Sequence, residues 1–154
     1  MNSNEIKHVL KGNTVTRSVF LDVYPVDRLP ANPIQNDRWV LVVNCCPSNF
    51  QGEHWIAMFC EEGKINFFDS FGFSPVMYEG IVPFLRTQGW PNSVDVIFND
   101  IKLQSIETDA CGHYCILFAF FRAQFIDFKT ILFQMHNISE STRDMIMKII
   151  VSLL

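Results

Sequence analysis

Four side chains of this sequence have the chemistry that a thiol nucleophile requires. Cys111 offers the thiol, His54 a base, Asp69 an acid that orients the base, and Gln104 an amide N–H. In such a set the histidine takes the thiol proton and the carboxylate fixes its tautomer. The amide donates to the oxyanion of a tetrahedral intermediate. Together these residue types predict nucleophilic catalysis on an acyl group.

Cys111 precedes an apolar run. Residues 114–121 contain no charged side chain, which predicts a helix that is buried on nearly every side. Asp109 is predicted to be the N-cap, so Cys111 falls in the first turn, where unpaired N–H groups and the helix dipole lower a thiol pKa. Taken alone, however, this stretch favours a free cysteine that acts as a small buried hydrophobe.

His54 and Asp69 are expected to be neighbours. His54 opens a β-rich run over 54–60, and Asp69 closes the next run over 65–69, with a tight turn at 61–64. Strands joined by such a turn are antiparallel, so the start of the first lies beside the end of the second. Each residue alone is typical of a strand end or a turn, but side by side they form a base and its orienting acid.

The middle of the chain predicts a series of strands. They cover residues 39–46, 54–60, 65–69, 94–98 and 101–104. The preceding segment, 13–38, holds three prolines and is predicted to be an extended loop with one short apolar piece.

Helices are expected before and after these strands. The capping box Asn2-x-x-Glu5 starts one that ends at Gly12, and a weakly helical stretch over 76–89 is predicted to break at Pro83. Helices over 128–135 and 137–154 follow the one at Cys111. Asn137 is the predicted cap of the last helix, whose predicted buried side is Met145, Ile146, Ile149, Ile150 and Leu153.

This order of elements indicates the α+β class. We expect a mostly antiparallel central sheet packed on the buried helix that starts at the nucleophile, with flanking helices, in one domain over 1–154. Nearly half of the 154 residues are apolar, enough for a substantial core. No apolar run reaches the roughly 18 residues of a membrane span. The first residues lack a signal-peptide pattern, so we expect an intracellular protein. We also expect the protein to be a monomer.

Charge and cysteine content narrow the function further. The net charge of −4 and the absence of consecutive basic residues give little support for nucleic-acid binding. Five cysteines without a secretory signal do not describe a disulfide framework. Cys111, His113 and Cys115 lack the spacing of a zinc knuckle, and no second pair follows, so no metal is expected.

The motifs as a set resemble the adenovirus-type cysteine proteases, the adenain family, and more broadly the clan of ubiquitin-like-protein proteases. They are His54-Trp55, Asp69-Ser-Phe-Gly-Phe-Ser74, Gln104 and Ala110-Cys111-Gly112-x-x-Cys115. The order His, acid, Gln, Cys is that of the clan. The turn after the acid and the seven-residue step from Gln to Cys favour the adenovirus branch. The resemblance covers about residues 5–126.

The resemblance implies a role for each residue. Cys111 is the nucleophile, His54 its base, Asp69 the orienting acid, and Gln104 an oxyanion donor beside the backbone N–H of Cys111. It also implies an endopeptidase that cleaves after Gly-Gly-like sequences in a narrow cleft, because glycine lets the substrate backbone approach closely. The expected task is maturation of capsid or other virion proteins.

Several features depart from the adenovirus enzymes. Asp69 stands where those enzymes usually carry Glu. No cysteine lies between Cys60 and Cys111, so an activating peptide cannot be tethered there by a disulfide. The acidic balance does not support DNA as a cofactor, and the sequence requires none. The compact chain fits the protease of a Polinton-like DNA transposon, a virophage or another small DNA virus.

Three other functions remain open. The chain could be an isopeptidase acting on ubiquitin or a ubiquitin-like protein, with the same chemistry. It could be a catalytically inactive binding module of the same fold, although the intact set of four residues argues against this. The last alternative is an unrelated structural domain with chance matches.

Overall fold

In the described part of the chain, five strands and five α-helices make up the fold. A computed structural model describes residues 1–50, 52 and 54–154. The elements are α1 (Ser3–Gly12), β1 (Phe20–Pro25), the 3₁₀ turn η1 (Val26–Arg28), β2 (Arg38–Asn44), β3 (Trp55–Glu61), β4 (Lys64–Asp69), the 3₁₀ turn η2 (Pro75–Met77), α2 (Ile81–Thr87), β5 (Asp95–Phe98), α3 (Cys111–Ala123), α4 (Phe128–His136) and α5 (Glu140–Ser152).

The strands form one mixed sheet in the order β1-β2-β3-β4-β5. The predicted antiparallel pairs are present as β2–β3 and β3–β4, while β1–β2 and β4–β5 are parallel. The α+β class is therefore confirmed, with a larger parallel share than the sequence predicts. The parallel pairs need longer connections, which the helices and loops around them supply.

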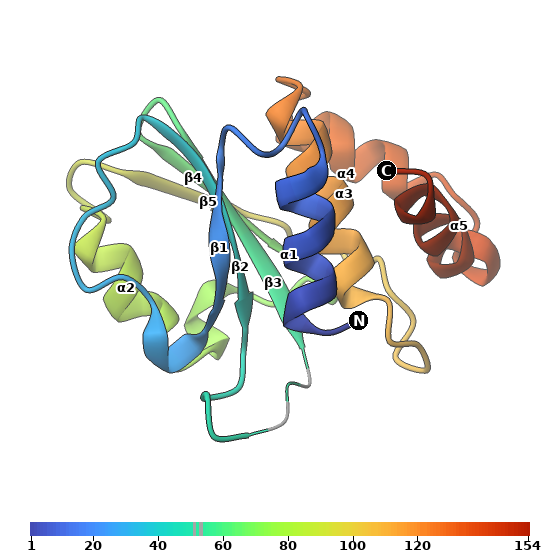
Figure 1. The fold of residues 1–154 in the computed structure, drawn as a ribbon, viewed down its shortest axis with the longest axis horizontal. Coiled ribbons are helices and arrows are strands. Elements are labelled where there is room, and N and C mark those ends of the chain that lie inside the picture. Colours follow the sequence, from blue (N-terminus) through green and yellow to red (C-terminus); the bar gives the residue numbers. More distant parts are fainter. Residues whose placement is uncertain (51, 53) are drawn as a thin grey trace.

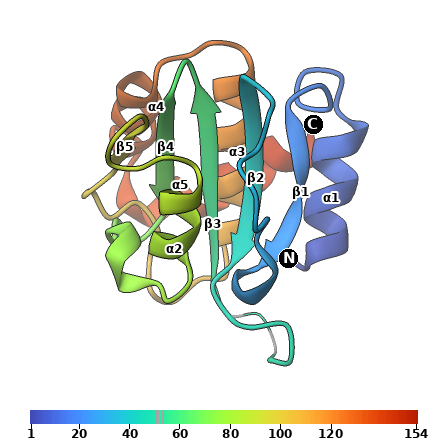
Figure 2. The same cartoon turned by 90° about the vertical axis from the view of Figure 1, so that its left-hand side faces the viewer.

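Helices cover both faces of the sheet. α1 and α3 lie on one face with α4 and α5 beyond α3, and α2 lies on the other face (Figures 1 and 2). Strand β2 shows why both covers are needed. Val40 and Val42 pack into the core around α3, while Trp39, Leu41 and Val43 pack into the core around α2. Successive side chains of a strand point to opposite faces, so an all-apolar strand must be buried on both.

Two strand predictions are wrong. Residues 20–25, expected within a loop, form β1. Phe20 and Val23 pack under α1 and α3, Leu21 and Tyr24 pack against the core around α2, and the prolines lie at the end of the strand or beyond it. Residues 101–104 form no strand, and the N–H of Gln104 donates to the carbonyl of Ser70 instead of to a ladder partner. A turn predicted over 47–52 falls partly outside the described residues.

Two helix starts follow from local sequence rules. The capping box at α1 is present, since Asn2 accepts from the N–H groups of Asn4 and Glu5 and the Glu5 carboxylate accepts from the Asn2 N–H. The sequence predicts a helix break at Pro83, but Pro83 lies inside α2. It lies in the first turn, where a missing N–H costs no intrahelical bond.

Two predicted N-caps are wrong. Ala110, not Asp109, precedes α3, and the Asp109 side chain pairs with Lys148 on α5. Ser139, not Asn137, precedes α5.

The predicted buried face of α5 is only partly right, since Ile146 and Ile150 pack partly buried against the core. The buried residues are Arg143, Asp144, Met147 and Val151, whereas Met145, Ile149 and Leu153 are exposed. The prediction missed Arg143 and Asp144 because it assigned the buried face from apolar residues alone, and these two charged side chains bind the rest of the fold. No helix in the described part of the chain is both long enough and apolar enough to cross a membrane.

Candidate active site

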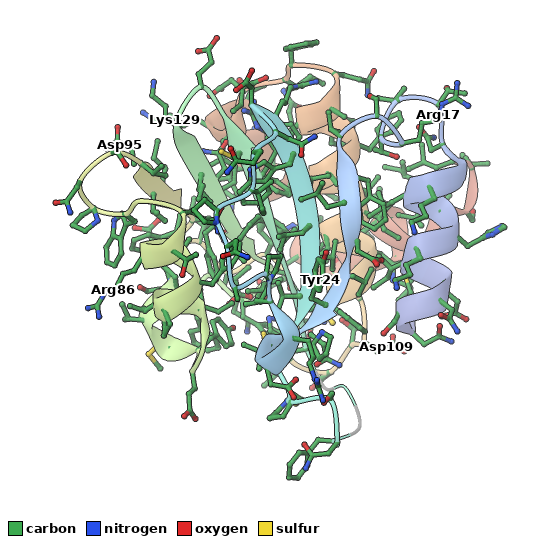
Figure 3. All side chains as sticks on the ribbon, turned by 60° about the vertical axis from the view of Figure 1, so that its left-hand side comes forward. Arg17, Tyr24, Arg86, Asp95, Asp109 and Lys129 are labelled. Atoms are coloured by element: carbon green, nitrogen blue, oxygen red, sulfur yellow. The ribbon has the colours of Figure 1, made fainter. Side chains whose placement is uncertain are left out.

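Three chain segments meet at one end of the sheet. The start of β3, the end of β4 and the start of α3 lie together there (Figure 1). The β3–β4 register pairs Ile56 with Asp69, which places His54 just beyond the strand pair and beside the acid. Cys111 is the first residue of α3. Figure 3 shows Asp109 at this end of the molecule and Lys129, in the first turn of α4, at the other end.

His54 and Asp69 form a hydrogen-bonded pair. Nε2 of His54 donates to Oδ1 of Asp69 at 2.8 Å, and the two side chains are 13% and 0% exposed. Among the described residues, Nδ1 of the ring is buried and has no hydrogen-bond partner. The carboxylate therefore fixes the proton on Nε2 and leaves Nδ1 to exchange a proton with another group.

The Asp69 carboxylate is held by several donors. Besides the histidine, Oδ1 accepts the N–H of Phe71 at 2.8 Å. Oδ2 accepts the N–H of Phe73 at 3.2 Å and the hydroxyl of Tyr78. With both oxygens bound, the carboxylate has little freedom to rotate, so it holds the imidazole in one orientation.

The loop after β5 holds the backbone at Asp69. The side chain of Asn99 accepts the Asp69 N–H at 3.0 Å and donates to the Asp69 carbonyl at 2.6 Å. Gly72 has a φ of +74°, and a Cβ there would lie 2.8 Å from the carbonyl carbon of Ile101. Only glycine fits this turn, which brings the loop close to the acid.

Cys111 and His54 shift each other's pKa values. Burial alone would raise the pKa of the Cys111 thiol, but the His54 ring and the N–H groups of Trp55 and Gly112 lower it below its ordinary value. Burial alone would lower the pKa of His54, but Asp69 and Cys111 raise it from 6.5 to about 9. Both shifts favour a thiolate beside an imidazolium, the reactive form of a cysteine nucleophile.

The other buried thiols lack this arrangement. Burial raises the pKa of Cys60 to about 11, and it raises the pKa values of Cys45 and Cys115 as well. Within the described residues, no group of three His, Cys, Asp or Glu side chains is placed to hold a metal ion.

Gln104 lies in the loop that returns from β5 to α3, and it is buried. Its backbone N–H donates to the Ser70 carbonyl at 3.0 Å. In its side chain, Oε1 accepts the Ser70 hydroxyl at 2.7 Å and Nε2 donates to the Thr108 carbonyl at 2.7 Å. Gln104 is thus hydrogen-bonded directly to Ser70, the residue that follows Asp69. The structure therefore brings Gln104 to the end of the sheet that carries the His54–Asp69 pair.

Helix α5 holds the same loop in place. Asp144 accepts the N–H of Ser105 at 3.0 Å, the hydroxyl of Thr108 at 2.6 Å and the hydroxyl of Tyr114 at 2.6 Å. Arg143 donates to backbone carbonyls, among them that of Leu103 at 2.8 Å. These bonds explain why charged residues face inward on α5.

Four residues of this arrangement were not assigned a role from the sequence: Ser70, Tyr78, Asn99 and Asp144. Ser70 lies inside the motif at 69–74, so its position beside the acid was a usable signal. The other three are separated from their partners by 9 to 39 positions, with no periodic pattern to connect them.

The fold is that of the ubiquitin-like-protein-protease type of cysteine protease, as comparison with solved structures shows. The structure resembles the ASFV pS273R protease with a TM-score of 0.58 and 16% identity, over 94% of this chain and 66% of that one. This chain thus spans just under two thirds of the viral protease. It also resembles the SUMO protease Ulp1, with its catalytic cysteine oxidised to a sulfinic acid, at a TM-score of 0.53 and 11% identity, over 98% of this chain and 78% of that one.

A second structure of Ulp1, with the cysteine oxidised to a sulfonic acid, gives a TM-score of 0.53 and 12% identity, over 98% of this chain and 79% of that one. No protein-family model and no curated protein matches the sequence.

Proposed function

We propose that this chain is a cysteine endopeptidase in which Cys111 is the nucleophile. The observation that carries the proposal is the His54 ring, which binds Asp69 through Nε2. The pKa of His54 is raised and that of Cys111 is lowered, and both shifts favour an imidazolium–thiolate pair. A histidine oriented in this way takes the thiol proton and later gives it to the leaving amine.

The reaction proceeds through an acyl-enzyme. The Cys111 thiolate attacks the substrate carbonyl carbon, and the resulting oxyanion accepts from the Gln104 amide and the Cys111 backbone N–H. The C–N bond breaks as the protonated His54 transfers its proton to the leaving amine. Water, deprotonated by His54, then attacks the thioester, and the C–S bond breaks to regenerate the pair.

Burial of the nucleophile supports a Gly-Gly-like substrate. Cys111 is only 6% exposed. A substrate residue with a bulky side chain would therefore clash with the residues around the thiol before the substrate carbonyl could reach the sulfur. Glycine has no side chain and lets the backbone approach closely. The resemblance of the motifs to adenovirus-type proteases leads to the same proposal.

We further propose that the enzyme matures capsid or other virion proteins in a small DNA virus or a Polinton-like element. The likeness of the fold to a viral protease supports this. We also propose that the enzyme needs no added cofactor. The contacts within the chain that hold Asp69, His54 and the Gln104 loop support this.

The second candidate function is an isopeptidase. It is favoured by the fold likeness to a protease named for SUMO. Both functions share the chemistry, but an isopeptidase recognises the folded ubiquitin-like protein as well as its tail. A ubiquitin or SUMO probe with a reactive C-terminus labels such an enzyme, whereas short Gly-Gly peptides suffice for the endopeptidase.

Cleavage of short peptides tests the proposal. A Gly-Gly peptide with a fluorescent leaving group is incubated with the wild type and with Cys111→Ala, with and without DNA. We expect turnover by the wild type without DNA and none by the variant. Labelling by the ubiquitin or SUMO probe alone would instead identify the isopeptidase. No turnover of any Gly-Gly peptide by the wild type, together with no labelling by either probe, would leave the inactive binding module as the function.

A further inference from the structure

We infer that the segment after Asp69 forms a subsite for apolar side chains on the leaving-group side of the scissile bond. This inference rests on the proposed function, because it assigns a specificity to that site. The residues concerned are Phe71, Phe73, Val76 and Met77, called here the apolar patch.

The direction of the substrate follows from the catalytic geometry. The acyl carbon must lie between the Cys111 sulfur and the oxyanion donor Gln104. The leaving nitrogen must lie beside His54, because that ring supplies its proton. The part of the substrate that is released therefore runs past His54.

Two aromatic side chains follow His54, each in contact with the one before it. The Phe71 ring stacks on the imidazole with centroids 4.8 Å apart, and the Phe73 ring lies 6.2 Å from that of Phe71. An extended peptide advances about 3.3 Å per residue. Each ring-to-ring step therefore matches one or two residues of an extended leaving segment.

The patch is exposed and uncharged. Phe73 is 50% exposed, Val76 65% and Met77 67%. No charged residue occurs over 70–78. Large apolar side chains that remain in contact with water next to a reactive centre mark a place where another apolar surface binds. Because Phe71 stacks on the His54 ring, which protonates the leaving nitrogen, the occupant of the patch is the leaving segment of the substrate, with apolar side chains.

Acyl transfer to added amines measures this subsite separately from acylation. The acyl-enzyme is formed from a Gly-Gly-aminomethylcoumarin substrate, and leucinamide, phenylalaninamide, glycinamide or aspartic acid amide competes with water. The amine nitrogen attacks the thioester carbonyl, its proton passes to His54, and the C–S bond breaks. The ratio of peptide product to acid product then reports how well each amine occupies the leaving-group side.

We expect leucinamide and phenylalaninamide to trap the acyl-enzyme about fivefold better than glycinamide, because partial burial of an apolar side chain provides a free energy that corresponds to a ratio of this size. Aspartic acid amide is expected to be the poorest acceptor. Phe73→Ala should reduce the leucinamide preference to less than about twofold by the same reasoning, and Phe73→Leu should keep it. Phe133→Ala, which removes a 63% exposed aromatic side chain on α4, is the matched control and should leave the ratios unchanged.

Two outcomes overturn the inference alone. Equal trapping by all four amines means that no apolar subsite exists, and a leucinamide preference that survives Phe73→Ala places the subsite elsewhere. If no coumarin is released at all, the acyl-enzyme does not form, and the proposed function fails together with the subsite.

Discussion

The Ser70 hydroxyl donates a hydrogen bond of 2.7 Å to Oε1 of Gln104, and both side chains are buried. Since Nε2 donates to the Thr108 carbonyl, which cannot itself donate, these contacts fix which end of the amide carries the N–H groups. The amide therefore enters the reaction already oriented, and donors held in advance stabilise an oxyanion most effectively.

Ser70→Ala should reduce kcat while leaving KM unchanged. The loss of one buried hydrogen bond of about 0.5–1.5 kcal/mol corresponds to a decrease of up to about tenfold. Gln104→Ala should cost about 100-fold or more, and the double variant no more than Gln104→Ala alone, because Ser70 acts through Gln104. Steady-state kinetics on a Gly-Gly peptide measures these values.

The control for Ser70→Ala is the exposed Ser18→Ala, which should behave as the wild type. Alkylation of Cys111 by iodoacetamide should be as fast in Ser70→Ala as in the wild type, since His54 is unaffected. Slower alkylation would show that Ser70 supports the nucleophile rather than the amide.

The pH dependence of kcat/KM should be bell-shaped. The acid limb should lie below the ordinary pKa of a thiol, because interaction with the His54 ring lowers the pKa of Cys111. Activity should be lost as the pH rises through about 9, where His54 loses the proton that the leaving amine requires. A profile whose alkaline limb lies near pH 6.5 would contradict the ion pair.

Asp69→Asn should move the alkaline limb toward lower pH. The Asp69 carboxylate is one of the groups that raise the pKa of His54, and an amide does not carry its charge. We also expect kcat to fall by about 10²–10⁴-fold, because the tautomer of the histidine is no longer fixed. The same pH–rate measurement on both proteins tests this, and an unchanged alkaline limb would exclude Asp69 as the partner that holds the proton on His54.

Cys111 should alkylate faster than the other thiols at neutral pH. It combines a lowered pKa with a position at the His54 ring, whereas burial raises the pKa values of Cys45, Cys60 and Cys115. Peptide mapping after a short exposure to iodoacetamide gives the rate at each cysteine. His54→Ala should bring Cys111 down to the rate of the others, and equal rates in the wild type would contradict an activated nucleophile.

Asp144→Ala should destabilise the fold by about 1–3 kcal/mol, since it removes the acceptor of three hydrogen bonds, of which the one from the Tyr114 hydroxyl is buried. The urea dependence of unfolding gives this value. Asp95→Ala, at an exposed position on β5, should change the free energy of unfolding by less than about 0.5 kcal/mol. A similar small effect for Asp144→Ala would mean that α5 does not hold the loop of Gln104.

The sequence predicts the side chains of the site better than it predicts their supports. His54 and Asp69 could be placed together because a hairpin with a tight turn has a defined register. Tyr78 and Asn99 could not, since their contacts depend on the path of irregular loops. The buried face of α5 was found only in part for another reason: apolar periodicity cannot detect the charged residues Arg143 and Asp144 that anchor it.

Trapping the acyl-enzyme tests the central claim most directly. The wild type is mixed with a Gly-Gly-aminomethylcoumarin substrate, quenched in acid within the first turnover, and digested for mass spectrometry. We predict a coumarin burst equal to the enzyme concentration and a thioester on the peptide that contains Cys111, with neither in Cys111→Ala. Turnover that leaves no adduct on Cys111, or that persists in Cys111→Ala, would contradict the assignment of Cys111 as the nucleophile.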